Sequence, residues 1–588
     1  MYPQGLPTGQ TAPSAQGFRP AMPPALPSAL PSALPAATPP GTAPTPRPRP
    51  HSRPRRLGRA ALFCATLAWA GNAPAAATLP RTLVYCSEGN PVGLQPALQS
   101  DGASFDASSR TLYSRLIEQQ PGTAALIPGL ATSWEASADG LSYLVHLRSG
   151  VRFHSGFGFR PTREFNADDV VFTFGRMLDP RHPYHRVSNG SYVYFVSMGL
   201  DKLLASVDKV DDHTVRFGLR HANAAFPDDL SMDFASIDSA EYAAWLAARG
   251  RKQDLDLKPI GTGPFELVAY QPDSMIRYRA FEHYWRGRPP LDNLVFAIVP
   301  DASVRWAKLR AGECQLMASP NPADLAAMRA DPAIRVADSG PALNVSYVAF
   351  NTLKPPLNDL RVRKALYLAI RKKAIVDAVF GGRAVPAVNP LAPAIWSYDR
   401  GIADLPYDPA QARRLLAEAG YPKGLELELS AMTIARPYLP DARRMAVMIQ
   451  SDWERIGVHT RVVTFEWGEY LRRLEAGSHQ AAIMGWSADN GDPDNFLGTL
   501  LSCDGVHTQQ NPANFCFAPY QKLIVDALRT SDRQQRIAMY QQAQRIFHQQ
   551  LPWVPMAHAS ILVPMSVRVQ GYVASPAGIH DFSTTRID

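Results

Sequence analysis

After residue 77 the sequence has no uninterrupted apolar run of about 18 residues, the length that a helix needs to cross a bilayer. It also lacks Gly-x-Ser-x-Gly, His-Glu-x-x-His, a phosphate loop and a dinucleotide fingerprint. Histidines number 14 and are scattered, and no internal repeat is visible. We therefore expect a soluble protein with no metal site and no cofactor, and binding is favoured over catalysis.

Acidic residues are missing from the first 77 positions, which hold seven arginines and no lysine. The formal net charge of +8 comes mostly from this segment, because the remaining chain has 53 basic against 52 acidic residues. A chain with so little net charge gives no reason to expect a nucleic-acid partner.

Residues 1–50 consist mainly of Pro, Ala, Ser, Thr and Gly, which indicates a disordered extension or a mis-called gene start. Residues 51–77 have a basic region, a short apolar run and an Ala-x-Ala site, which together predict a signal peptide that is cleaved near Ala77. Four cysteines follow the cleavage site, and an even number in an exported protein suggests disulfide bonds. Three connectivities are possible for Cys86, Cys314, Cys503 and Cys516.

Strand and helix patterns alternate along the rest of the chain, which favours an α/β architecture. Short apolar or alternating runs predict strands, among them 341–351, 458–465 and 481–484. Apolar side chains at helical spacing predict helices over 106–119, 167–177, 360–379, 441–456 and 467–474.

The stretch 481–496, AAIMGWSADNGDPDNF, has the pattern of a ligand-binding edge. A short apolar strand ends at Gly485-Trp486 and is followed by an Asp/Asn/Gly/Pro loop. An aromatic wall beside a carboxylate suits a cation such as an ammonium group. The same composition is also typical of ordinary turns. A calcium loop is disfavoured, because Pro493 interrupts the run and no closing Glu stands at the required offset.

Segments spread over most of residues 81–588 resemble the periplasmic dipeptide-binding proteins of ABC transporters, within the family 5 solute-binding group. The segments that carry the resemblance are Leu83–Gly89, Phe105–Ser109, Asn166–Phe172, Ile260–Phe265, Pro300–Arg305, Arg443–Gln450 and Gly485–Phe496.

The resemblance implies an α/β, two-lobed and hinged periplasmic-binding-protein fold of type II, cluster C. Lobe I would comprise residues 81–341, with an extra subdomain at about 113–262, and lobe II would comprise 342–559. Residues 560–588 would return to lobe I. The resemblance also implies disulfide bonds between Cys86 and Cys314 and between Cys503 and Cys516.

Two charged residues match the positions that hold a peptide's termini in this family. Asp489 would bind the α-ammonium group and Arg436 the α-carboxylate, with Trp486, Ser100 and Gly102 as neighbours. The chain departs from the family pattern at 387–400 and 504–514, where side-chain preference is expected to differ. The amino-terminal extension has no counterpart in the family.

The function implied is that of the periplasmic substrate-binding component of an ABC importer, which binds dipeptides between its lobes. Its expected partners are the dipeptide and the permease subunits in the inner membrane, with a chemoreceptor as a further candidate, and a monomer is expected. One alternative keeps the fold and changes the ligand to haem, 5-aminolevulinate or glutathione. An alternative of another class, disfavoured by the missing motifs, is a secreted hydrolase.

Overall fold

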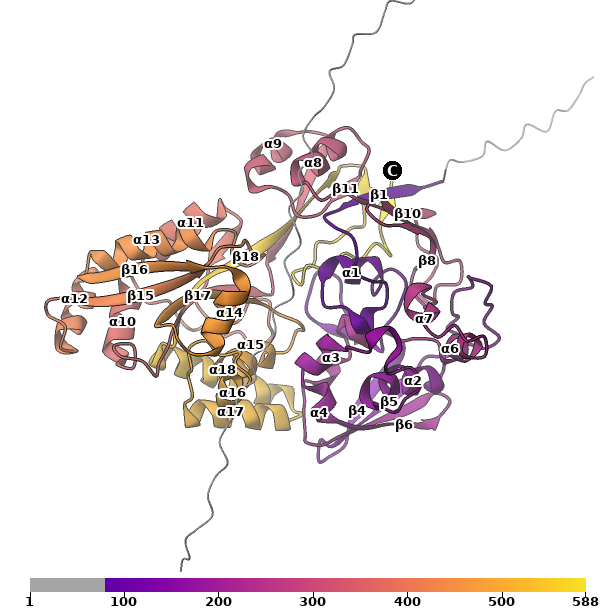
Figure 1. Ribbon diagram of the computed structural model, residues 1–588, viewed down its shortest axis with the longest axis horizontal. Coiled ribbons are helices and arrows are strands. Elements are labelled where there is room, and N and C mark those ends of the chain that lie inside the picture. Colours follow the sequence, from indigo (N-terminus) through magenta and orange to yellow (C-terminus); the bar gives the residue numbers. More distant parts are fainter. Residues whose placement is uncertain (1–79) are drawn as a thin grey trace, which may run out of the picture. The chain divides into compact units, whose positions relative to one another are not determined.

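A mixed sheet of 12 strands runs through residues 80–588, the part of the chain that this computed structural model describes (Figure 1). The predictions for residues 1–50 and 51–77 concern segments that lie outside these described residues. The main path of the sheet, in spatial order, is β16 (Val458–Phe465), β15 (Leu425–Met432), β17 (Ala481–Ser487), β13 (Asn344–Phe350), β18 (Trp553–Ser566), β11 (Leu316–Met317), β1 (Thr82–Ser87), β10 (Asn293–Ile298), β9 (Met275–Ala280) and β8 (Phe265–Gln271). Two further strands, β12 (Ile334–Pro341) and β14 (Ala384–Pro386), pair with β18.

The 14-residue strand β18 is shared by the two halves of this sheet. Its first part pairs with β13, where Val554 lies opposite Val348. Its last part pairs with β11, where Met565 lies opposite Leu316. One continuous strand therefore links the hydrophobic core around β13 to the core around β1.

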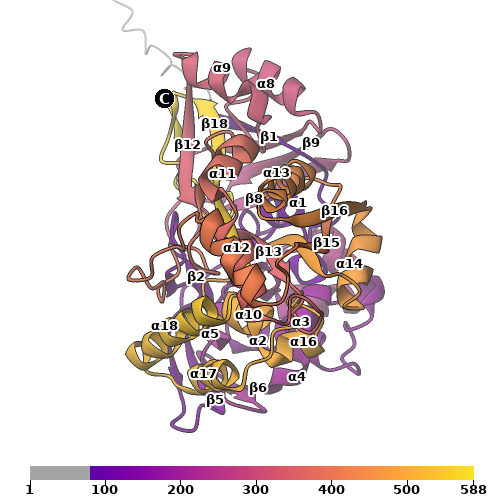
Figure 2. The same cartoon turned by 90° about the vertical axis from the view of Figure 1, so that its left-hand side faces the viewer.

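Strand β13 is buried on both faces, which explains why its sequence is an almost continuous apolar run. Val348 and Phe350 point into one hydrophobic cluster, whereas Val345 and Tyr347 point into another. The Tyr347 ring stacks on Trp553 of β18, with ring centroids 3.7 Å apart. Helices from the same part of the chain complete both clusters (Figure 2). They are α10 (Leu360–Leu368), α11 (Lys372–Phe380), α12 (Pro409–Glu418), α13 (Ala442–Glu454) and α14 (Trp467–Glu475) for the first cluster, and α15 (Asp494–Leu501), α17 (Ala518–Arg529) and α18 (Arg533–Gln550) for the second.

A second, antiparallel sheet of four strands lies in the amino-terminal half and has its own hydrophobic cluster. Within this cluster Arg176 is fully buried and forms ion pairs with Asp238 and Asp256 at 3.1 and 2.9 Å. The strands, in spatial order, are β4 (Ala131–Ala136), β5 (Ser142–Leu147), β7 (Thr214–Leu219) and β6 (Leu204–Asp211). The helices of this half are α1 (Gly102–Ala107), α2 (Ala167–Leu178), α3 (Val193–Ser197), α4 (Leu200–Leu203), α5 (Phe226–Asp229), α6 (Ala240–Ala247), α7 (Asp254–Leu257), α8 (Ala302–Arg310) and α9 (Leu325–Ala330). Two short strand pairs lie outside both sheets: β2 (Ile117–Gln119) with β3 (Leu126–Pro128) in this half, and β19 (Val569–Gln570) with β20 (Arg586–Ile587) near the carboxyl terminus.

Most helices that the sequence predicts are confirmed, but two are not as predicted. The helix predicted over 106–119 is wrong, because α1 ends at Ala107 and residues 117–119 form β2. Ser108 and Thr111 donate their hydroxyl hydrogens to backbone carbonyls of the preceding turn, which favours a series of turns over a continued helix. The helix predicted over 360–379 is divided into α10 and α11. At the break, the Asp452 carboxylate accepts hydrogen bonds from the backbone and the side chain of Arg371.

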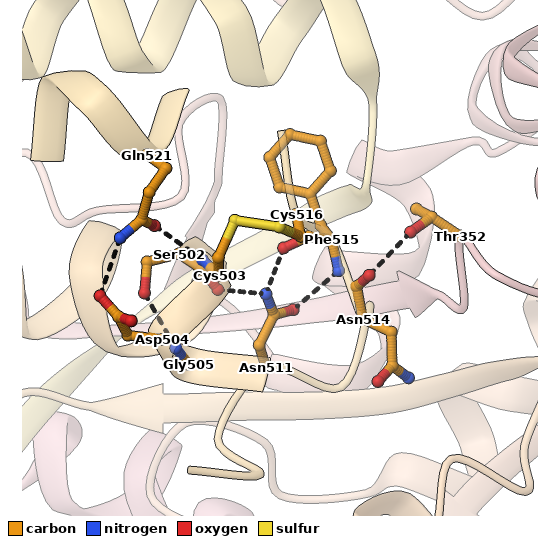
Figure 3. The surroundings of a disulfide bond; sticks show 10 residues. All are labelled: Thr352, Ser502, Cys503, Asp504, Gly505, Asn511, Asn514, Phe515, Cys516 and Gln521. Carbon is orange, nitrogen blue, oxygen red and sulfur yellow. Dashed lines mark hydrogen bonds between the residues drawn. A yellow bond between two sulfur atoms is a disulfide. The ribbon is translucent and has the colours of Figure 1, made fainter. Parts of the chain in front are cut away.

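Disulfide bonds join Cys86 to Cys314 and Cys503 to Cys516, the pairs that the resemblance implies. The second bond closes a loop that includes the short helix α16 (Cys503–His507), and Figure 3 shows its surroundings. Within this loop the Asn511 amide donates to the carbonyls of Ser502 and Phe515, at 3.1 and 2.8 Å. The loop is therefore held both covalently and by a buried side chain. Among residues 80–588, no helix is both long enough and apolar enough to span a membrane.

Candidate functional site

The loop 488–493 follows strand β17 and lies at the edge of the sheet, as the stretch 481–496 predicts. Gly485 is needed in this strand, because a Cβ there would collide with the ring of Tyr438 and would lie 2.7 Å from the Val345 carbonyl. The close approach lets the Tyr438 ring pack directly against the strand. The loop then leads into α15, so Trp486 and Asp489 are positioned by two rigid elements.

Asp489 is held by two side chains, one from a distant segment of the chain and one from the adjacent helix α15. The Tyr194 hydroxyl of α3 donates to Oδ1 at 2.5 Å, and Asn495 Nδ2 donates to Oδ2 at 3.1 Å. Asn495 Oδ1 also accepts from the Trp486 indole nitrogen at 2.9 Å, which fixes the indole beside the carboxylate. Burial raises the pKa of Asp489, and the hydrogen bonds from Tyr194 and Asn495 partly offset this rise. Because a carboxylate has about four lone-pair sites, Asp489 can still accept bonds from a further donor.

Arg436 lies in the turn between β15 and α13, where its backbone forms an isolated bridge with Leu439. Two hydrogen bonds of 2.9 Å between these residues hold the turn. The guanidinium carbon lies 3.9 Å from the centre of the Trp467 ring, which is a cation–π arrangement. Its Nε atom is buried and makes no hydrogen bond with any described residue. No described carboxylate forms an ion pair with this guanidinium, so its positive charge can bind an anion in the cavity that it lines.

Arg436, Trp486 and Asp489 all line one cavity of about 440 Å³. Most of its other walls are apolar, and a smaller number of polar side chains project into it. The remaining lining residues are Tyr347, Pro437, Tyr438, Trp467, Leu471, Leu474, Glu475, Met484, Gly485, Ser487, Leu500, Gln509, Gln510 and Pro512. A mostly apolar cavity with one cationic and two anionic side chains suits a small zwitterion with apolar parts.

Residues 125–508 match a family model described as "Bacterial extracellular solute-binding proteins, family 5 Middle". The chain belongs to this family. It is 50% identical over 514 residues to the dipeptide-binding protein of Escherichia coli strain K12, covering 87% of this chain and 96% of that protein. It is 49% identical over 507 residues to heme-binding protein A of Haemophilus influenzae, covering 86% and 92%.

A solved structure extends the comparison to three dimensions. The dipeptide-binding protein of Pseudoalteromonas sp. SM9913, in complex with Met-Leu, superimposes with a TM-score of 0.71 at 39% identity. The match covers 86% of this chain and all of that one. The fold class predicted from the sequence, an α/β, two-lobed periplasmic-binding-protein fold, is thereby confirmed.

The family 5 site residues predicted from the sequence do not all lie in the cavity. Ser100 and Gly102 flank Asp101, which caps the amino terminus of α1, and neither residue belongs to the cavity lining. Helix α1 is nevertheless close to the site, because its Phe105 stacks on Tyr194 with ring centroids 5.8 Å apart. Roles for Ser100 and Gly102 in ligand binding stay predictions.

Sequence reasoning missed three residues that shape this site: Tyr194, Asn495 and Trp467. Trp467 had a usable signal, because it shares a helical face with Leu471 and Leu474 in the predicted helix 467–474. Tyr194 had none, since its partner Asp489 lies 295 positions away. Among the described residues, no group of three or more His, Cys, Asp or Glu side chains is arranged to hold a metal ion.

The loop that carries Asp489 also packs against the amino-terminal half of the chain. Asn490 Nδ2 donates to the Asp229 carboxylate of α5 at 3.1 Å. The next acidic residue, Asp492, pairs with Arg536 of α18 at 2.7 Å. Burial raises the pKa of the neighbouring Asp494 from 3.8 to about 7; the charge of Asp492 adds to the rise and that of Arg536 opposes it.

The raised pKa of Asp494 predicts a pH-dependent loss of stability. The folded protein binds this proton more tightly than the unfolded chain does, so the associated stability is present below about pH 4 and is lost as the pH rises towards about 7. Asp494→Asn removes the ionisation. We expect the variant to be close to the parent protein in stability at pH 4 and to be more stable at pH 8, by on the order of 1–3 kcal/mol. Urea unfolding at both pH values measures the difference, and an equal destabilisation at both would contradict the assignment.

Proposed function

We propose that this protein is the substrate-binding component of an ABC importer and that it binds dipeptides. The observation that carries the proposal is the pair of opposite charges in one cavity, the Asp489 carboxylate and the Arg436 guanidinium. A free peptide carries an ammonium group and a carboxylate at its two ends. Carboxylates bind guanidinium groups through two parallel hydrogen bonds, and a buried carboxylate suits an ammonium group.

Two fixed charges also select the length of the ligand. An extended chain covers about 3.5 Å per residue, so each added residue moves one terminus away from its partner. A peptide too long for the cavity would leave one buried charge unpaired, at a cost of about 3 kcal/mol. The names of two similar proteins support this class of ligand, since one is a dipeptide-binding protein and one was solved with Met-Leu bound.

The domain limits proposed for this function follow the two sheet halves. We assign 81–341 and 560–588 to lobe I, with a subdomain at about 113–262 that includes the four-stranded sheet, and 342–559 to lobe II. Ligand that bridges both lobes would favour the closed state of the hinge. The hydrogen bond from Tyr194 of α3 to Asp489 directly joins the two proposed lobes. The proposed setting is the periplasm, as a non-catalytic monomer that delivers peptide to inner-membrane permease subunits, with a chemoreceptor as a further candidate partner.

Haem is the second candidate ligand, because heme-binding protein A is similar over most of the chain. The cavity argues against it, since no histidine or cysteine is found among the described residues that line it. Iron would have to use Met484 or one of two tyrosines, Tyr347 and Tyr438. 5-Aminolevulinate and glutathione also carry an ammonium group and carboxylates, and they are arms of the test below. A secreted hydrolase would have to release amino acids from dipeptides.

A ligand panel tests the proposal on the protein freed of bound ligand by unfolding and refolding. The panel contains Ala-Leu, N-acetyl-Ala-Leu, Ala-Leu-amide, a tripeptide, free leucine, haem, 5-aminolevulinate and glutathione. We expect only the free dipeptide to raise the melting temperature strongly, because ligand at 100 times its dissociation constant stabilises the folded state by about 2.7 kcal/mol. Calorimetry gives the affinities. A larger effect of N-acetyl-Ala-Leu, or of haem, would overturn the dipeptide assignment.

A further inference from the structure

The cavity contains a third charged side chain that the two peptide termini do not use. Its lining includes Arg436, Asp489 and Glu475, and only the first two match the ends of a peptide. Glu475 is the last residue of α14 and is exposed to solvent at the mouth of the cavity. A carboxylate at this place can attract a cationic group of the ligand if no positively charged side chain of the protein neutralises it.

No described arginine or lysine forms an ion pair with Glu475. The two arginines nearest in sequence, Arg472 and Arg473, both pair with Glu469 on the other side of the helix. Arg473 also lies over the Phe465 ring, with 4.2 Å between the guanidinium carbon and the ring centre. Glu475 therefore keeps its negative charge available to a ligand in the cavity.

Glu475 lies on the same face of helix α14 as Trp467, the residue that positions Arg436. Trp467, Leu471, Leu474 and Glu475 follow one another at helical spacing and all line the cavity. Trp467 stacks on the guanidinium of Arg436. A peptide carboxylate bound to Arg436 would therefore lie near the start of this helix face. Glu475 lies eight positions further on, about 12 Å along the helix axis. A short ligand side chain would stay far from Glu475, and lysine and arginine are the cationic side chains that extend furthest towards it.

The remaining polar wall near Glu475 is neutral. Gln509 and Gln510 line the cavity from the loop that the Cys503–Cys516 disulfide closes. The backbone carbonyl of Asn514 accepts a hydrogen bond from the Thr352 hydroxyl, which fixes the end of the loop to the segment that follows β13. Amide groups accept and donate hydrogen bonds without adding charge, so these two glutamines do not neutralise Glu475.

We propose that Glu475 is a specificity-determining residue that favours a lysine or arginine side chain on the carboxy-terminal residue of the bound peptide. The inference rests on the proposed function, because it takes the peptide carboxylate to lie at Arg436. Glu475 is exposed, so its contribution is that of a surface ion pair. We expect the protein to bind Ala-Lys about two- to fivefold more tightly than Ala-norleucine, its uncharged counterpart, at low salt. The preference should shrink at high ionic strength.

Calorimetry on three proteins tests the assignment: the parent, Glu475→Gln and Glu418→Gln. Glu418 is a matched control, because it is an exposed glutamate and the last residue of α12, as Glu475 is of α14. Glu475→Gln should abolish the preference for Ala-Lys and leave the affinity for Ala-norleucine unchanged, and Glu418→Gln should change neither.

The outcomes separate this inference from the proposed function. An equal preference for Ala-Lys in the parent and in Glu475→Gln would overturn the role of Glu475 alone. A preference for Lys-Ala over norleucine-Ala that is larger than that for Ala-Lys would overturn its placement beside the carboxy-terminal residue. If no dipeptide of the set binds, the proposed function fails and the inference fails with it.

Discussion

Replacement of Asp489 by asparagine is expected to weaken dipeptide binding by at least about 100-fold while the protein stays folded. The carboxylate is buried, and loss of one partner of a buried, hydrogen-bonded charge pair costs about 2–5 kcal/mol or more. Calorimetry with Ala-Leu measures the loss, and circular dichroism checks the fold. The affinity of the parent protein should also fall as the pH drops through the raised pKa of Asp489, because the ammonium group needs the ionised carboxylate.

Two controls isolate the charge of Asp489 from its hydrogen bonds. Tyr194→Phe removes the 2.5 Å hydrogen bond to Oδ1 and keeps the charge, so it should lower the affinity by less than about tenfold. N-acetyl-Ala-Leu lacks the ammonium group and should bind equally weakly to the parent protein and to Asp489→Asn. An Asn variant that binds Ala-Leu within threefold of the parent would remove Asp489 from the clamp.

Replacement of Arg436 by glutamine should also reduce the affinity for Ala-Leu by at least about 100-fold, because the peptide carboxylate would lose a charged partner inside a cavity. Arg436→Lys keeps the charge but loses the planar fork and the stacking on Trp467, so it should recover only part of the affinity. Calorimetry on the three proteins gives the ranking.

The ligand provides the matching control for Arg436. Ala-Leu-amide has no carboxylate, and its affinity should be nearly the same for the parent and for Arg436→Gln. The four measurements form a double-mutant cycle, and a coupling energy close to zero would show that Arg436 and the carboxylate do not interact.

Much of the lobe that contains β13 could be predicted from the sequence, because its signals are local. The helices predicted over 441–456 and 467–474 are observed as α13, which Asp441 caps, and α14, each within two residues of the predicted ends. The strand β16 begins and ends at the predicted residues, 458 and 465. In these segments the apolar spacing and the capping residues favour the same element, so a short stretch of sequence is sufficient.

The failures occurred where side chains compete with the backbone or where distant segments meet. Serine and threonine hydroxyls replaced a helix after Ala107, and Asp452 interrupted another at Arg371 from 81 positions away. The same distinction between local and distant signals applies to the residues of the site. The resemblance provided Asp489, Arg436 and Trp486, and all three line the cavity, but their roles stay predictions. Tyr194 depends on a contact between distant parts of the chain, which no local pattern could indicate.

The continuity of β18 limits how this chain can vary in length. Successive side chains of a strand point to opposite faces, so one inserted or deleted residue would exchange the faces of all residues beyond it. In β18 the exchange would affect two cores at once, since Trp553 packs near one end and Met565 near the other. We therefore expect natural and engineered changes of length to be accepted in the surface loops and rejected between Trp553 and Ser566.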